Sequence, residues 1–289
     1  MPRLVWLTDL HLNFVTEDQI PPLAEEIRNQ KPSAVLIGGD LGEADSWEAY
    51  LHQLDELLRV PLYFVLGNHD YYGGSIHAVR ERARQFNGES NRLHWLPASG
   101  FISLDSQTAL VGHGGWGDAR AADFFRSRVL LNDYYLISEL KAAAGIPVDQ
   151  TNWPGGEPSA VLNTGLANKL HELGDETARH FREVVPRALE RHEHVIVLMH
   201  VPPFREACWH DGRISDDNWA PHFCSIAAGE ALTDIMKRHP LKKMTVLCGH
   251  THSRGEAWPL PNLTVYTGQA KYGHPAVARA FDTETFFTL

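Results

Sequence analysis

The fold is decided around residues 62–70, LYFVLGNHD, where an apolar run ends in a glycine followed by three polar residues. The run has the length and the aliphatic and aromatic composition of a β-strand that is buried on both faces, as in a parallel sheet. Asn68, His69 and Asp70 then place an amide, an imidazole and a carboxylate after the end of that strand. Open α/β sheets bind their ligands at this end. The stretch therefore predicts a sheet and a site at its rim.

Four other apolar runs end in a similar way, each followed by residues that can hold a metal ion. They are Leu4 to Leu7 before Asp9 and His11, Ala34 to Ile37 before Asp40, Val195 to Met199 before His200, and Met244 to Cys248 before His250 and His252. The two segments between the runs at residues 4–7, 34–37 and 62–66 read as helices, the second with leucines at helical spacing. This alternation is typical of βαβ units and a parallel sheet. We therefore expect an α/β fold with all these residues at one rim.

After residue 100 the alternation of strand and helix patterns gives way to a different pattern. Phe101 to Leu104 and Thr108 to Gly112 flank Asp105-Ser106-Gln107 and predict a hairpin that begins a second sheet. Two later segments, Leu263 to Thr267 and Ala278 to Phe281, are expected as antiparallel strands of that sheet. Residues 116–192 show mainly helical patterns. We interpret residues 1–289 as one domain, with 116–192 as a helical insertion near the mouth of the site.

Composition excludes several classes of protein. The chain has 289 residues, of which 43% are hydrophobic and 21% charged, as is ordinary for a globular protein. No apolar segment approaches the roughly 20 residues of a membrane span, and no signal peptide is recognised. The three cysteines are too few and too widely spaced for a disulfide framework, which favours the reducing cytoplasm. A net charge of −10 and the lack of a basic stripe argue against nucleic acid as a partner.

The polar residues at the strand ends form a candidate set of metal ligands. In Asp-x-His and His-x-His, both side chains of the pair can reach the same side of an extended chain. A carboxylate such as Asp40 can bind two ions at once, and an amide oxygen such as that of Asn68 adds no negative charge. The candidate ligands are Asp9, His11, Asp40, Asn68, His200, His250 and His252. No motif assigns a role to His113.

These motifs resemble those of the calcineurin-like metallophosphoesterases. That superfamily carries Asp-x-His, Gly-Asp, Gly-Asn-His-(Asp/Glu), His and Gly-His-x-His in this order. The corresponding residues here are Asp9-Leu10-His11, Gly39-Asp40, Gly67-Asn68-His69-Asp70, His200 and Gly249-His250-Thr251-His252. No position of the five motifs is substituted, and they extend from residue 9 to residue 252.

The resemblance implies a fold and a ligand assignment. The expected fold is a four-layer αββα sandwich of two mixed β-sheets flanked by helices, with a dinuclear metal site at the carboxyl ends of the strands. One metal is expected to bind Asp9, His11, Asp40 and His252, and the other Asp40, Asn68, His200 and His250. Asp40 would bridge the two ions. By resemblance the ions are manganese or iron, while the ligand chemistry also suits zinc or nickel.

The expected reaction is hydrolysis of a phosphate ester. Two adjacent ions can share a hydroxide that attacks phosphorus, so that no protein nucleophile is needed. His69 is the family's candidate for the general acid that protonates the leaving oxygen, and Asp70 could orient it. The alternatives are that His69 only positions substrate and that Asp70 is purely structural.

Substrate preference depends on the walls of the site. Arg205 could bind a phosphate oxygen, and Trp209, Trp219 or Tyr134 could stack on a base or sugar. The helical insertion would narrow the cleft, which favours small phosphomonoesters or phosphodiesters, nucleotides among them. One alternative is a nuclease of the same superfamily, and another is a non-catalytic interaction module with the same fold. The sequence leaves the oligomeric state open.

Overall fold

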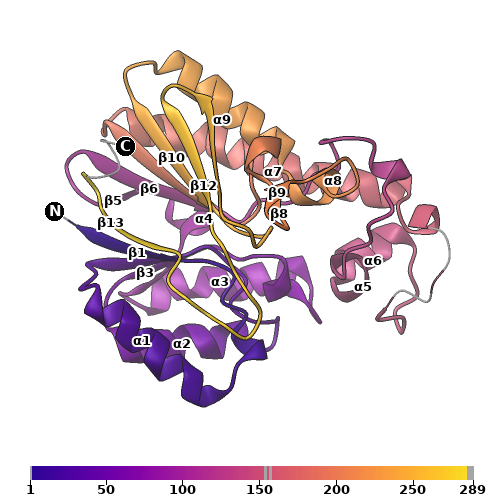
Figure 1. Ribbon diagram of the computed structural model, residues 1–289, viewed down its shortest axis with the longest axis horizontal. Coiled ribbons are helices and arrows are strands. Elements are labelled where there is room, and N and C mark those ends of the chain that lie inside the picture. Colours follow the sequence, from indigo (N-terminus) through magenta and orange to yellow (C-terminus); the bar gives the residue numbers. More distant parts are fainter. Residues whose placement is uncertain (1, 153–154, 156–157, 285–289) are drawn as a thin grey trace.

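The structure is a computed structural model that describes residues 2–152, 155 and 158–284 (Figure 1). Its strands form two large sheets and one short two-stranded sheet. The strands are β1 (Arg3–Leu7), β2 (Ala34–Ile37), β3 (Leu62–Phe64), β4 (Leu93–Trp95), β5 (Ile102–Ser103), β6 (Thr108–His113), β7 (His194–Met199), β8 (Trp209–His210), β9 (Arg213–Ile214), β10 (Lys243–Cys248), β11 (Gly255–Leu260), β12 (Leu263–Thr267) and β13 (Arg279–Asp282). The α-helices are α1 (Ile20–Asn29), α2 (Trp47–Leu58), α3 (Ile76–Glu89), α4 (Leu96–Ser99), α5 (Asp133–Leu136), α6 (Ser138–Ala144), α7 (Thr164–Leu189), α8 (Ala220–Phe223) and α9 (Ile226–Arg238). The described residues also form short 3-10 helices, which are η1 (Leu12–Phe14), η2 (Glu17–Gln19), η3 (His69–Tyr71), η4 (Phe124–Arg126), η5 (Pro158–Ala160) and η6 (Arg205–Ala207).

Both large sheets are parallel in their interior and antiparallel at an edge. The first has the order β13-β1-β2-β3-β4, in which only β13 is antiparallel to its neighbour. The second has the order β11-β12-β10-β7-β6-β5, with β11 and β5 antiparallel to their neighbours. The β5–β6 pair confirms the predicted hairpin and the start of a second sheet there.

The last strands correct one expectation. β12 lies in the second sheet as expected, but it is parallel to β10. β13 belongs to the first sheet, where Ala280 pairs with Val5 of β1. The segment 268–278 between them therefore passes from one sheet to the other. Alternation of apolar residues identified both strands but carried no information about which sheet each one joins.

The side chains of each strand alternate between two cores, and this alternation creates the layers. In β1, Val5 and Leu7 pack against the helices of the first sheet, whereas Leu4 faces the second sheet. In β7, Val197 belongs to the core under the outer helices and Ile196 to the core between the sheets. Each fully buried aliphatic side chain contributes about 1.5 to 3 kcal/mol of transfer free energy. The two sheets thus share an apolar interface.

Helices cover the outer faces of both sheets. α1, α2 and α3 contribute to the core of the first sheet, and α7 and α9 cover the second, on the opposite side of the molecule in Figure 1. The predicted four-layer arrangement of two mixed sheets between helices is confirmed. None of the described helices has the length and apolar composition needed to cross a bilayer.

Within the described part of residues 116–192 there are helices and no strand. α7 packs on the second sheet, while α5 and α6 lie to one side of the sandwich (Figure 1). That this segment is an insertion into a single domain stays a prediction.

Candidate metal centre

The loops that carry the predicted ligands follow strands that end at the same level. The parallel register places Leu7 beside Ile37 and Ile37 beside Phe64, so β1, β2 and β3 end together. In the second sheet Leu198 of β7 lies beside Leu247 of β10. Five carboxyl ends, three from one sheet and two from the other, therefore open onto one site.

The first group of candidate ligands consists of Asp9, His11, Asp40 and His252. One ligand atom from each of the four lies within 4.8 Å of the others. The Nε2 atoms of His11 and His252 are 3.1 Å apart, and His252 Nε2 is 3.5 Å from a carboxylate oxygen of Asp9. His11 Nε2 is 3.7 Å from Oδ2 of Asp40. Imidazole and carboxylate groups at these separations can bind one ion together.

The second group consists of Asp40, Asn68, His200 and His250. Oδ1 of Asn68 is 2.9 Å from Nε2 of His200 and 3.0 Å from Nδ1 of His250. His200 Nε2 is also 3.4 Å from Oδ2 of Asp40. Asp40 therefore contacts both groups, and its position is compatible with a bridging role.

The contact between Asn68 and His200 fits a bound cation. His200 Nδ1 faces the carbonyl oxygen of Gly38 at 2.9 Å and donates its proton there. Burial lowers the pKa of His200, so the ring is neutral and Nε2 carries a lone pair. This lone pair faces the amide oxygen of Asn68, which is also an acceptor. Two ligands bound to one ion at about 2.1 Å and at right angles would lie about 3 Å apart.

The charges of the site also favour a cation. Burial, together with the neighbouring carboxylates of Asp9 and Asp70, raises the pKa of Asp40 well above its ordinary range. Burial and the proximity of His69 lower the pKa of His11 to about 2, so this imidazole is neutral and can act as a ligand. Buried carboxylates that repel one another are stabilised in their ionised form by a bound metal ion.

Five of the predicted ligands have a left-handed backbone conformation. Their φ angles are 51° at Asp9, 44° at His11, 54° at Asp40, 69° at His250 and 61° at His252. Residues other than glycine reach this region at a cost of about 1 to 3 kcal/mol each, and such strain is concentrated at functional sites. The surrounding packing holds these turns in place.

Among the described residues, Asp70 makes no side-chain hydrogen bond to His69. Its carboxylate accepts hydrogen bonds from the backbone N–H groups of Asp40, Leu41, Gly42 and Gly67, at 2.8 to 3.1 Å. Burial raises the pKa of Asp70 to about 6, while the four hydrogen bonds oppose this rise. The interpretation that Asp70 orients His69 does not match these contacts. Asp70 joins the loop after β2 to the loop after β3.

His69 lines the cavity and lies beside His11, a member of the first group of candidate ligands. Its ring stacks on Tyr72 at 4.3 Å, and its Nε2 is 3.5 Å from the hydroxyl of Tyr272. Among the described residues, Nδ1 of His69 has no hydrogen-bond partner. Burial and the neighbouring His200 lower the pKa of His69 to about 3, which makes the ring neutral at pH 7.

A cavity of about 290 Å³ opens over the candidate ligands. Its wall includes members of both metal groups, aromatic side chains, and residues of the helical segment 116–192. The lining residues are Asp40, Asn68, His69, Tyr72, Leu130, Leu131, Asn132, Asp133, His210, Trp219, Phe223, His250, His252 and Tyr272.

Of the four predicted substrate contacts, Trp219 lies in this wall and the other three lie outside it. Arg205 donates to Asp217 at 2.5 Å and lines a separate surface hollow. Trp209 packs against Gly255, where an added Cβ would lie 1.9 Å from the indole. Tyr134 is buried, and its hydroxyl pairs with Nδ1 of His222 at 2.5 Å. Local sequence could not distinguish these packing roles from exposure in the cleft. His113 is also buried, and its Nδ1 accepts from the backbone N–H of Gly115.

Several wall residues were missed by sequence reasoning. Tyr72 lies three residues after His69, and its proximity to the motif was an available signal. Asp133 and Tyr272 lie in segments with no motif, so no signal in one sequence identified them. Tyr272 packs over the ring of His11 at 4.4 Å and lies 5.1 Å from that of His252.

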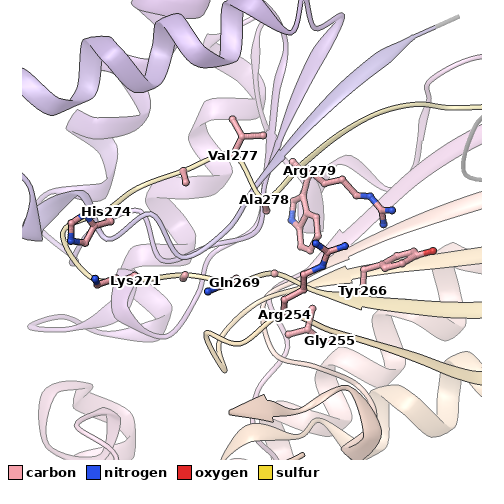
Figure 2. Close-up of a pocket in the computed structure, with 14 residues that line it drawn as sticks. Arg254, Gly255, Tyr266, Gln269, Lys271, His274, Val277, Ala278 and Arg279 are labelled. Carbon is pink, nitrogen blue, oxygen red and sulfur yellow. The ribbon is translucent and has the colours of Figure 1, made fainter. Parts of the chain in front are cut away.

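A second and larger cavity, of about 550 Å³, lies beside the crossing segment 268–278. Arg254, Lys271 and Arg279 line it, and its wall includes none of the candidate metal ligands (Figure 2). The Arg279 guanidinium lies over the ring of Tyr266 at 4.6 Å. Four of the candidate metal ligands, Asp40, Asn68, His250 and His252, line the smaller cavity instead.

The two mixed sheets and the carboxylate and histidine groups at their shared edge define a candidate metallohydrolase. Residues 2–254 match the family described as calcineurin-like phosphoesterase, and the chain belongs to this family. A 76-residue stretch is 32% identical to an uncharacterized metallophosphoesterase from Helicobacter pylori; it covers 25% of this chain and 20% of that protein.

Two solved structures are similar over nearly the whole chain. A phosphopantetheinyl hydrolase from Mycobacterium tuberculosis has a TM-score of 0.61 and 15% identity, over 94% of this chain and 90% of that one. A dimetal phosphatase from Danio rerio has a TM-score of 0.55 and 14% identity, over 95% of this chain and 90% of that one. At such low identity the likeness establishes a shared fold.

Proposed function

We propose that this protein hydrolyses small phosphomonoesters or phosphodiesters with the help of two metal ions, manganese or iron. One ion would be held by Asp9, His11, Asp40 and His252, and the other by Asp40, Asn68, His200 and His250. The observation that carries the proposal is the pair of acceptors, His200 Nε2 and Asn68 Oδ1, that face each other at 2.9 Å in a buried, carboxylate-rich site. A cation bound by both atoms would make that contact favourable.

The proposed roles of the two ions, of His69 and of Asp70 follow from their positions in the site. Two ions in such a site activate water and neutralise phosphate oxygens during an in-line displacement. His69 lies beside the ligands and faces the cavity, so it is placed to bind the ester and to give a proton to the leaving oxygen. The negative charge of a bound phosphate would raise the pKa of His69 and favour its protonated form. Asp70 holds the loops that carry Asp40 and Asn68.

The cavity supports a small substrate with an aromatic or otherwise planar part. Its volume of about 290 Å³ suits a small molecule better than a folded protein surface. The rings of Tyr72, Trp219 and Tyr272 in its wall offer stacking surfaces. The names of the two structurally similar proteins, a phosphopantetheinyl hydrolase and a dimetal phosphatase, also favour a phosphate ester.

Turnover of chromogenic esters tests this proposal. The protein is stripped with a chelator, reloaded with Mn²⁺, and assayed with p-nitrophenyl phosphate and bis(p-nitrophenyl) phosphate. We expect metal-dependent release of nitrophenol from at least one ester. His200→Ala should lower kcat at least 100-fold, because it removes a ligand of the second ion. His77→Ala, which changes an exposed histidine at the start of α3, is the matched control.

The outcomes separate the candidate functions. Binding of two Mn²⁺ ions without turnover of any mono- or diester would favour the non-catalytic interaction module. Failure to bind Mn²⁺, Fe²⁺ or Zn²⁺ at all would overturn the proposed site. Preference for the diester or the monoester would assign the reaction subclass.

A further inference from the structure

The orientation of the Asn68 side chain decides whether this residue can be a metal ligand. An amide binds a metal ion through its oxygen, whereas its NH₂ group is only a donor. In the structure Oδ1 points towards His200 and His250, and Nδ2 points the opposite way. A contact with Nδ2 is therefore needed to hold the amide in this orientation.

Asp133 supplies the contact that fixes the amide. Its carboxylate Oδ1 accepts a hydrogen bond from Asn68 Nδ2 at 2.9 Å and another from the hydroxyl of Tyr72 at 2.6 Å. Asp133 is 2% exposed, so these bonds form away from bulk water. A carboxylate only accepts, so the group of Asn68 that faces it must be NH₂. Flipping the amide would place Oδ1 of Asn68 against the Asp133 carboxylate, so that two acceptors would meet and the hydrogen bond between Asn68 and Asp133 would be lost.

The backbone that carries Asp133 is tied to the loop that follows Asn68. The N–H of Gly73 donates to the carbonyl of Leu136 at 2.9 Å, and the N–H of Ser138 donates to the carbonyl of Gly74 at 3.0 Å. These bonds hold the start of α6 and the end of α5 against the residues after η3. Two backbone contacts shortly after Asp133 thus help to set its position relative to Asn68.

We infer that Asp133 is a positioning residue, which fixes Asn68 as an oxygen ligand, and that the helical segment 116–192 thereby completes the metal centre. The inference rests on the proposed metal site but not on turnover. It gives α5 a role beyond forming part of the cavity wall.

The inference predicts a selective loss of metal affinity. Residues that orient metal ligands typically change affinity 10- to 100-fold when they are removed. In Asp133→Ala we expect one Mn²⁺ to bind about 10- to 100-fold more weakly, while the other binds as in the wild type. Asp133→Asn keeps an acceptor oxygen for Asn68 and should recover part of the affinity. Calorimetric titration of the chelator-stripped proteins with Mn²⁺ alone measures both sites.

Glu139 provides a matched control from the same helical segment. Its carboxylate accepts from the Ser75 hydroxyl and from the backbone N–H groups of Ile76 and His77, at 2.8 to 3.0 Å. It therefore attaches the segment to α3 without contacting a metal ligand. Glu139→Ala should lower the free energy of unfolding but leave both Mn²⁺ affinities within twofold of the wild type.

A spectroscopic readout distinguishes positioning from general loosening. In the wild type loaded with two Mn²⁺ ions we expect an electron paramagnetic resonance spectrum of coupled ions, and in Asp133→Ala that of isolated ones at the same metal concentration. Equal losses of affinity in Asp133→Ala and Glu139→Ala would overturn the inference, as would wild-type affinity in Asp133→Ala. If Asp133→Ala does not fold, Asp133→Asn and Tyr72→Phe are compared instead, and wild-type affinity in both would overturn it.

The same titration keeps this inference separate from the proposed function. A wild-type protein that binds two Mn²⁺ ions but hydrolyses no ester would contradict the proposed function and leave the role of Asp133 open to the same measurement. Hydrolysis that persists with normal metal affinity in Asp133→Ala would contradict only the role of Asp133.

Discussion

Asp70 is next to His69 in the chain, but its carboxylate lies among the backbone N–H groups of two loops. Four such groups donate to it, from the residues after β2 and after β3. A buried carboxylate that satisfies several donors stabilises the backbone around it. Two adjacent residues of one motif thus have different surroundings. The Asp70 carboxylate binds backbone N–H groups, whereas His69 lines the cavity.

This difference leads to a prediction for two neighbouring variants. Asp70→Ala leaves four buried N–H groups without their acceptor, so we expect a loss on the order of 3 kcal/mol or more in the free energy of unfolding. His69→Ala removes a side chain that lines the cavity and should cost under about 1 kcal/mol while abolishing most turnover. Urea titrations of the metal-free proteins measure both. A stable Asp70→Ala with impaired turnover alone would contradict the assignment.

β7 shows how one strand serves three parts of the structure. Val197 packs under the outer helices, Ile196 faces the other sheet, and the strand delivers His200 to the site at its carboxyl end. At its other end the buried His194 contacts the hydroxyl of Thr245 on β10 through Nε2, at 2.8 Å. Burial lowers the pKa of His194 to about 4. This end of the strand is therefore sensitive to acid.

The pH dependence of stability follows from the direction of that shift. Between pH 6.5 and 4 the unfolded chain binds a proton at His194 that the folded chain does not, so stability is present above this window and falls as the pH falls through it. The contribution of His194 at pH 4.5 is a loss of about 2 to 3 kcal/mol relative to pH 7. His194→Gln cannot take up this proton.

Denaturant titrations in chelator from pH 7 to pH 4.5 measure the effect without interference from metal release. We expect a shallower loss of stability with falling pH in His194→Gln than in the wild type. Parallel curves for the two proteins would contradict the prediction.

At the scale of the whole molecule, the candidate metal centre joins the two sheets. Three of the ligand-bearing loops follow strands of the first sheet and two follow strands of the second. Bound ions would therefore connect parts of the fold that otherwise meet through apolar side chains. Ligands that bind only the folded state stabilise it by mass action.

Addition of Mn²⁺ should therefore raise the unfolding temperature. At a free concentration 100 times the Kd, each site contributes about 2.7 kcal/mol. At about 2 to 4 °C per kcal/mol, two sites correspond to a shift of roughly 10 to 20 °C. Calorimetry with and without chelator measures the shift. His200→Ala should show about half of it, and an equal shift in both proteins would place the stabilising ions elsewhere.

Much of the fold was predictable because its signals are local. Apolar runs and the helical spacing between them identified the parallel strands, and the change of pattern near residue 101 identified the second sheet. The sheet joined by β13 was predicted wrongly, because an alternating strand fits the edge of either sheet. Residues 268–278, which precede β13, pass from the second sheet to the first and so bring β13 beside β1.

The sequence alone determined which residues form the polar strand ends, because a metal-binding motif needs particular side chains at fixed short spacings. Only the tertiary structure revealed the contacts of Asp70, Asp133 and Tyr272, and it placed Arg205, Trp209 and Tyr134 outside the cavity wall. A hydrogen bond between Asn68 and Asp133 joins residues 65 positions apart. Such a contact depends on how the helical segment packs against the sheets, and no short stretch of sequence encodes it.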